Sequence, residues 1–229
     1  MENKNYHIAS ALVSMNDCGI KAMVAGNQEE ARAIFQQALR RLRQEMALVA
    51  PIPEEDSTIL ESYATGLHAR LQTAVTLTVD ASFDFFDIAF SIQCNKASGA
   101  NLPLGAAAIL YNLALNDHLE FLTSGRSLFL RSATNFYKKA LRILFSLGEA
   151  RSEEEQCGRK CLFILALCNN LGHCYANLCD NKGTESCQDQ LSAILRDPDC
   201  AGALAMEEFE FFQLNAVVSR VTIKTAAAA

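Results

Sequence analysis

The chain contains 229 residues, half of them apolar and one fifth charged, and it carries a formal net charge of −6. This apolar content is enough for a sizeable core and excludes a wholly disordered chain. The acidic balance gives no general attraction to nucleic acid or to anionic membranes, so we expect neither as a partner.

Cysteine usage and the apolar runs bear on the compartment. No apolar stretch of signal-peptide length precedes Asn16, and the densest apolar run, residues 161–168, is much shorter than the roughly 20 residues that cross a bilayer. The nine cysteines are an odd number, so they cannot all pair within one chain. We therefore expect reduced thiols and a cytoplasmic protein, with the nucleus as the other possible location.

The N-terminal part has the pattern of two helices. Residues 6–26 carry apolar residues at helical spacing, and Gly26-Asn27 is a turn signal. Residues 28–50 then show one apolar face and one charged face, which is typical of a helix packed on a core. This helix should end at Pro51, because proline lacks the N–H that would continue it.

The pattern changes between residues 51 and 103. Residues 57–73 have apolar side chains at intervals of four, which predicts another helix. Residues 74–79 and 86–94 alternate with period two, which favours a strand pair with a turn at residues 80–82. One side of the second strand should pack on helices, and the other should face solvent. The packed side contains Phe86, Ile88, Phe90 and Ile92, and the solvated side contains Asp87, Ala89, Ser91 and Gln93.

Helical periodicity resumes at residue 104 and continues to residue 147, with a break at residues 123–126. Further helices are expected over residues 153–179, 184–195 and 203–219. The predicted fold class is therefore mostly α, with a small inserted extended or β segment around residues 74–94.

Five residues near the N-terminus follow the order and spacing of a known helical repeat: Gly19, Gly26, Ala31, Phe35 and Ala38. This resembles the tetratricopeptide repeat (TPR), a helix–turn–helix unit of 34 residues. In that family a small residue lets helix A approach helix B, a glycine makes the turn, and an Ala, an aromatic residue and an Ala pack helix B. Weaker echoes of the pattern occur within residues 110–140 and 168–195.

The resemblance implies a TPR-like α-helical repeat fold that forms a single domain over residues 1–229. Its units would cover about residues 6–50, 104–147 and 153–196, with an insertion at about 51–103. Gly19 and Ala31 should then be close-packing positions between the first two helices.

The resemblance also implies a protein-interaction module or scaffold rather than an enzyme. In such repeats the helix A faces line a concave groove that receives a peptide or partner segment. The positions that correspond to groove residues and that we expect to contact a partner are Asn16, Ile20, Met23, Tyr111, Leu115, His118, Asn169, His173 and Asn177. None of them is a lysine or arginine, so the groove should not hold an acidic chaperone C-terminal tail. The alternative for several of these residues is packing against the inserted segments.

Asparagines stand out in the predicted helices, because asparagine is a mediocre helix former. At least one of Asn169 and Asn170 should bond to a neighbouring helix or to the backbone of a ligand. Asn112 occupies a position similar to that of Asn170, two residues before the small residue of its unit. This repetition favours structural bonding for Asn112 and Asn170 and leaves Asn169 as the ligand candidate.

Seven of the nine cysteines lie between residues 157 and 200, with His173 among them. Four cysteines share one helix face: Cys157, Cys161, Cys168 and Cys179. Residues eleven apart on a helix lie roughly 16 Å apart, too far for one zinc ion, so at most Cys157 and Cys161 could share one. We expect neither a metal nor another cofactor, and we interpret the cysteines as small buried apolar side chains. Zinc binding and redox sensing are the alternatives.

The sequence contains no phosphate-binding loop and no motif of zinc proteases or serine hydrolases, and we assign no catalytic residue. The competing hypothesis is an enzyme with an Asn/His/Cys-lined pocket near residues 168–177. Such an enzyme would bring His118 or His173 within about 3.2 Å of an acid or thiol in an enclosed pocket.

Overall fold

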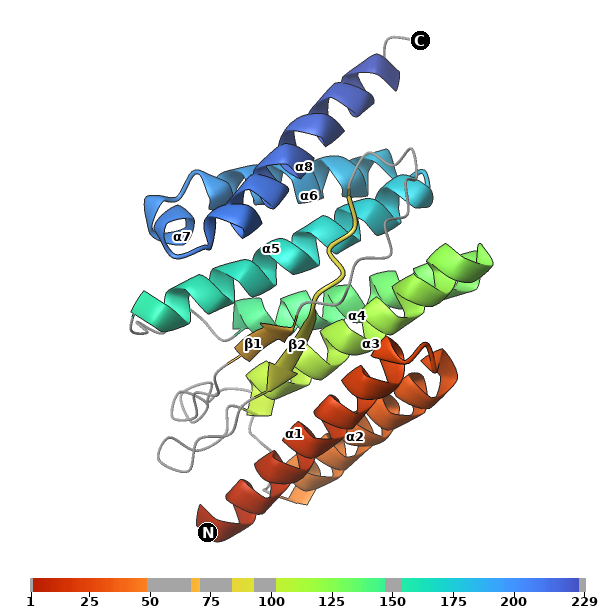
Figure 1. The fold of residues 1–229 in the computed structure, drawn as a ribbon, viewed down its shortest axis with the longest axis vertical. Coiled ribbons are helices and arrows are strands. Elements are labelled where there is room, and N and C mark those ends of the chain that lie inside the picture. Colours follow the sequence, from red (N-terminus) through yellow and green to blue (C-terminus); the bar gives the residue numbers. More distant parts are fainter. Residues whose placement is uncertain (1, 49–66, 71–83, 93–101, 147–153, 227–229) are drawn as a thin grey trace. The chain divides into compact units, whose positions relative to one another are not determined.

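The computed structural model describes residues 2–48, 67–70, 84–92, 102–146 and 154–226 (Figure 1). These residues form eight helices and two short strands, so this part of the chain is mostly helical, as predicted. None of the helices in these ranges is long and apolar enough to cross a membrane.

The described residues fall into two compact units. Unit 1 contains residues 2–48, 67–70, 88–92 and 102–146, and unit 2 contains residues 84–87 and 154–226. The single domain with three repeat units stays a prediction.

Unit 1 is built on two helical hairpins. Its helices are α1 (Glu2–Val24), α2 (Gln28–Leu48), α3 (Leu102–Ser124) and α4 (Ser127–Ser146). Each hairpin turns at a glycine with a positive φ, 79° at Gly26 and 68° at Gly125. Glycine adopts this left-handed conformation at little cost, so it ends the first helix of each pair. The predicted helices at 6–26 and 28–50 and the break at 123–126 are confirmed.

The two helices of the first hairpin approach each other closely at Gly19. A Cβ atom at this position would lie 2.5 Å from Cε1 of Phe35, closer than real side chains approach. Phe35 and Ala31 are both fully buried on α2. The expected close packing at Gly19 is confirmed, and its physical reason is the space that the Phe35 ring takes.

An ion pair joins α2 to α3. Arg32 Nε donates to Asp117 Oδ1 at 2.8 Å, and the Arg32 guanidinium lies 4.7 Å from the centroid of the Phe129 ring. Asp117 is only 2% exposed, so removal of Arg32 would leave a buried charge without its partner. Asn116 Nδ2 also donates to the carbonyl oxygen of Gln28, at 3.0 Å. These contacts hold the start of α2 against the second half of α3.

Unit 2 contains α5 (Glu154–Asn177), α6 (Asn181–Leu195), α7 (Pro198–Gly202) and α8 (Met206–Ala226). A Cβ atom at Gly183 would lie 2.6 Å from the Tyr175 ring, so α5 and α6 approach each other as closely as α1 and α2 do. The side chain of Asp180 caps α6 by accepting a hydrogen bond from the N–H of Gly183 at 3.0 Å. The helices predicted at 153–179, 184–195 and 203–219 are confirmed, and α7 is an additional short helix between the last two.

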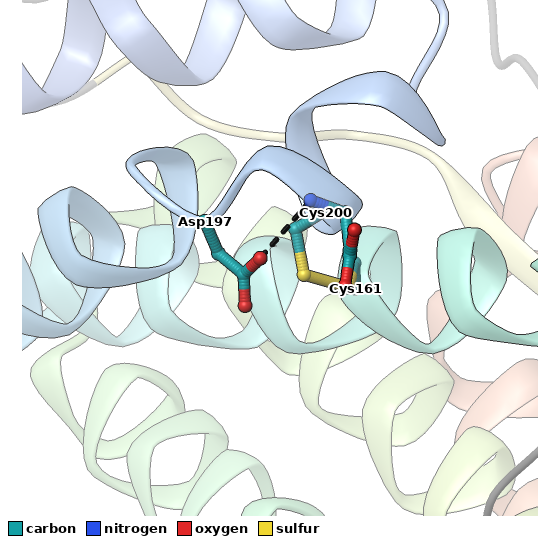
Figure 2. Close-up of a disulfide and its surroundings, with 4 residues drawn as sticks. Cys161, Asp197 and Cys200 are labelled. Carbon is teal, nitrogen blue, oxygen red and sulfur yellow. Dashed lines mark hydrogen bonds between the residues drawn. A yellow bond between two sulfur atoms is a disulfide. The ribbon is translucent and has the colours of Figure 1, made fainter.

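A disulfide joins α5 to α7 through Cys161 and Cys200 (Figure 2). Their Cα atoms are 5.8 Å apart, within the range that a disulfide spans. Asp197 starts α7 by accepting a hydrogen bond from the N–H of Asp199, and the resulting turn carries Cys200 to α5. The prediction that all thiols are reduced is therefore wrong for this pair, because an odd number of cysteines excludes complete pairing but allows a single disulfide. Cys18 and Cys179, which are exposed, and Cys168, which is buried, are thiols outside this disulfide.

The two strands form an antiparallel pair in unit 1. β1 (Leu67–Arg70) pairs with β2 (Ala89–Ile92), with Ala69 opposite Phe90. The helix predicted over 57–73 is therefore wrong at residues 67–70, where the chain is extended and gains a partner far along the sequence. The strand predicted at 74–79 lies outside the described residues. The strand predicted at 86–94 is confirmed in β2.

The exposure predicted for β2 is wrong on one side. Ala89 is fully buried and Ser91 is 7% exposed, so these residues of the side expected to face solvent are covered. Both are small, which lets β2 lie enclosed beside α1 and α3 (Figure 1). Phe86, Ile88, Phe90 and Ile92 are buried, as predicted.

Candidate functional site

The most unusual feature of the structure is an extended segment held by asparagine side chains. Residues 84–92, the internal segment, contain β2 and the residues just before it. From Ile88 onward every residue of the segment is buried, whereas Asp84 is exposed and Phe85 and Asp87 are half-buried. Buried main-chain polar groups need hydrogen-bond partners, and helix side chains supply several of them here.

In unit 1, the first clamp consists of Asn112 on α3 and Asn16 on α1. The N–H of Phe90 donates to Asn112 Oδ1 at 3.0 Å, and Asn112 Nδ2 donates back to the carbonyl oxygen of Phe90 at 2.7 Å. Asn16 Nδ2 donates to the same carbonyl at 3.0 Å, and its Oδ1 accepts a hydrogen bond of 2.9 Å from Asn112 Nδ2. Both asparagines are fully buried. One planar amide thus satisfies both main-chain groups of Phe90, and the second amide fixes its orientation.

In unit 2, the second clamp consists of Asn169 and Asn170 on α5 and Asn215 on α8. Asn170 accepts from the N–H of Phe86 at 3.0 Å and donates to its carbonyl oxygen at 2.9 Å. Asn215 holds Asp84 in the same two-bonded way, with both distances at 3.0 Å. Asn169 Nδ2 adds a bond of 2.8 Å to the Asp84 carbonyl, and its Oδ1 accepts a bond of 2.8 Å from Asn215.

The two clamps follow the same design. Each has asparagines on two helices, each contains a hydrogen bond between two asparagine side chains, and each bonds to main-chain groups of the internal segment. In unit 2 the bonded residues are 84 and 86, because alternate residues of an extended chain present their N–H and C=O groups to the same edge. In both units the amides bond to main-chain N–H and C=O groups.

Comparisons with protein-family models, with curated proteins and with solved structures give no match. The functional assignment therefore rests on the geometry of this site.

Aromatic rings pack against two side chains of the internal segment. In unit 1 the Phe90 ring meets the Tyr111 ring edge to face, with centroids 4.9 Å apart, and Tyr111 contacts Tyr137. In unit 2 the Phe86 ring lies 5.0 Å from Phe212 and 5.6 Å from Phe211, both on α8. Phe86 and Phe90 are 4% and 1% exposed, so each ring is buried among the side chains around it. Contacts of this kind add to the free energy of burial.

Several predicted partner-binding residues contact the internal segment. Asn16, Tyr111 and Asn169 bind or pack against it as described, and the His173 ring lies 5.9 Å from the Phe85 ring. The remaining predicted residues have other surroundings. His118 Nδ1 lies 3.5 Å from the Tyr137 hydroxyl, Asn177 bonds to His173, and the other three are buried: Ile20, Met23 and Leu115.

The titratable groups of α5 are adapted to burial. Desolvation lowers the pKa of His173 to about 4, so its imidazole is neutral at pH 7. Burial, and secondly the nearby Cys187, raises the pKa of the Cys168 thiol, so the thiolate is disfavoured. In the internal segment, partial burial raises the pKa of Asp87. The thiolate is the nucleophilic form of cysteine, so burial disfavours nucleophilic chemistry at Cys168.

Within the described ranges, no three metal-ligating side chains lie together. An open surface pocket at the turn between α1 and α2 contains neither histidine nor cysteine and is lined by Gly26, Asn27, Gln28, Glu29, Glu30, Ala33 and Glu120.

The structural bonding predicted for Asn112 and Asn170 is present in the structure. Each binds both main-chain groups of one residue in the internal segment. Asn215 was not singled out at all. The available signal was its place in an otherwise apolar stretch of a helix, between Leu214 and Ala216.

Proposed function

We propose that this protein is a TPR-like helical interaction module that binds an extended segment of a partner protein through asparagine clamps. The observation that carries the proposal is the two-bonded contact of Asn112, Asn170 and Asn215 with single residues of an extended chain. Recognition of extended peptides uses main-chain hydrogen bonds for affinity and side-chain seats for specificity, and both are present here.

The position of the clamps supports the TPR-like interpretation. Asn16, Asn112 and Asn169 lie on α1, α3 and α5, the helices that correspond to helix A of each proposed unit. In TPR-like proteins this face receives the ligand. Close approach at Gly19 and at Gly183 is the other feature that such helix pairs need.

The chemistry of the clamps supports a neutral partner segment and a non-enzymatic role. The clamp residues are amides, which neutralise no carboxylate, so the proposed partner is not an acidic chaperone tail. The raised pKa of the Cys168 thiol disfavours thiolate chemistry at this position. We propose the cytoplasm or nucleus as the location. Most cytosolic thiols are kept reduced, so the Cys161–Cys200 disulfide would be an exception there.

A displayed random-peptide library, selected on the purified chain, tests the proposal. We expect enriched peptides that bind the wild type and the variant Asn135→Ala equally, because Asn135 is exposed on α4 and belongs to neither clamp. Binding should weaken in a clamp variant such as Asn170→Leu. The proposal fails if no peptide is enriched over an uncoated surface, or if every enriched peptide ignores the clamp variants.

A further inference from the structure

We propose that the second clamp is an exchangeable partner site, in which residues 84–87 of this chain stand in for a partner segment that carries an aromatic residue at the Phe86 position. This inference rests on the proposed function, and it adds the place of exchange and the chemistry of the partner.

The first argument is the contrast in burial along the internal segment. Residues 88–92 are all buried, and residues 89–92 also pair with β1. Residues 84–87 have one buried member, Phe86, next to the exposed Asp84 and the half-buried Phe85 and Asp87. Replacing residues 84–87 therefore exposes one large apolar side chain, whereas replacing β2 would break a strand pair and open the core of unit 1.

The second argument is that the clamp does not require this particular sequence. Asn169, Asn170 and Asn215 bond to the N–H and C=O groups of Asp84 and Phe86, which any extended chain except one with proline at these positions presents. The three amides are nearly or fully buried and already oriented by bonds to one another. A preorganised site of this kind binds a new segment without further ordering.

The third argument is that the internal segment fits the site imperfectly. The Asp87 carboxyl is half-buried, and desolvation raises its pKa, so the charged form is disfavoured in this position. A partner with a neutral residue at this position avoids that cost. The preferred partner is therefore an extended segment with an aromatic residue at the Phe86 position, a neutral residue after it, and no proline at either clamped position.

The test uses a fluorescent peptide with the sequence of residues 83–88, the full chain, and the variant Phe86→Ala, which empties the aromatic seat and leaves the three asparagines in place. In the wild type, residues 84–87 compete with the peptide as a tethered segment, at an effective concentration in the millimolar range. Phe86→Ala weakens this competitor, so the variant should bind the peptide about tenfold or more tightly than the wild type does. Changing the peptide residue that matches Asp87 to Asn should raise affinity further.

Three controls make the result specific. A peptide methylated on the nitrogen that corresponds to Phe86 N should not bind, because it cannot donate to Asn170. The double variant Phe86→Ala/Asn170→Leu should not bind the unmodified peptide, whereas Phe86→Ala/Asn135→Ala should bind it like Phe86→Ala. Equal affinity for wild type and Phe86→Ala, or indifference to N-methylation, overturns the inference.

Hydrogen exchange on the wild type decides the question even if Phe86→Ala does not fold. Exchange at the Phe86 N–H should be at least about tenfold faster than at the slowest amides of α5, because residues 84–87 open without unfolding of the unit. Exchange as slow as that of α5 overturns the inference. Library peptides that bind elsewhere while this site stays closed would overturn the inference and leave the proposed function standing.

Discussion

Replacing Asn112 by leucine tests whether the first clamp stabilises the fold. Leucine has nearly the same size but neither donates nor accepts, so Phe90 loses two hydrogen bonds and Asn16 loses one. Phe90 and Asn16 are 1% and 0% exposed, so water cannot replace these bonds. The Phe90 carbonyl keeps the bond from Asn16 Nδ2.

The expected loss follows from the groups left without these bonds. One buried donor, the Phe90 N–H, and one buried acceptor, Asn16 Oδ1, each cost about 1–3 kcal/mol when their partner is removed. The apolar leucine side chain returns about 1 kcal/mol through burial. We therefore expect the free energy of unfolding to fall by about 1–5 kcal/mol. Asn112→Asp should cost more at pH 7, because a carboxylate would face the Phe90 carbonyl and Asn16 Oδ1.

Urea denaturation followed by circular dichroism gives the free energies, with Asn135→Ala as the matched control. Asn135 is exposed on the adjacent helix, so its removal should change stability by less than about 0.5 kcal/mol. A stability of Asn112→Leu within the same margin of the wild type would refute the reasoning, because it would mean that Asn112 does not bind Phe90 in solution.

Three further predictions concern other parts of the fold. Gly19→Leu should destabilise the protein by about 1–3 kcal/mol in thermal melts, because the fully buried Phe35 ring occupies the space that a side chain needs; an unchanged midpoint would contradict the close packing. The pKa of His173 is lowered to about 4, so the folded state resists protonation of this imidazole. The free energy of unfolding should therefore fall by about 3 kcal/mol as the pH drops from about 6.5 to about 4. His173→Gln should remove this loss when both proteins are compared by urea titration. The Cys161–Cys200 disulfide closes a loop of 39 residues, so Cys200→Ser should cost about 2–4 kcal/mol; a reductant should destabilise the wild type but not this variant, and equal effects on both would argue against the bond.

The helices could be predicted because their signals are local. Ala31, Phe35 and Ala38 are three or four residues apart and all lie on the buried face of α2, so helical periodicity alone identified it. The turn glycines Gly26 and Gly125 mark hairpin ends for an equally local reason, their positive φ.

The strand pairing and the clamps could not be predicted in the same way. Ala69 pairs with Phe90, and Asn170 bonds to a residue 84 positions away, so neither contact leaves a periodic pattern in the neighbouring sequence. Alternation in residues 86–94 indicated an extended chain, but the burial of Ser91 depends on what surrounds β2. A polar residue on a helix face indicates that a partner exists and does not identify it.

The clamps also imply an order of events during folding. The hairpins join helices that are neighbours in the chain, whereas the clamp bonds join residues 74, 96 and 131 positions apart. Contacts between distant residues require the closure of long loops, so we expect the hairpins to assemble first and the internal segment to dock late. Interactions that form after the transition state affect mainly the unfolding rate. The clamp asparagines would then act chiefly by slowing unfolding, which lengthens the lifetime of the native state once it has formed.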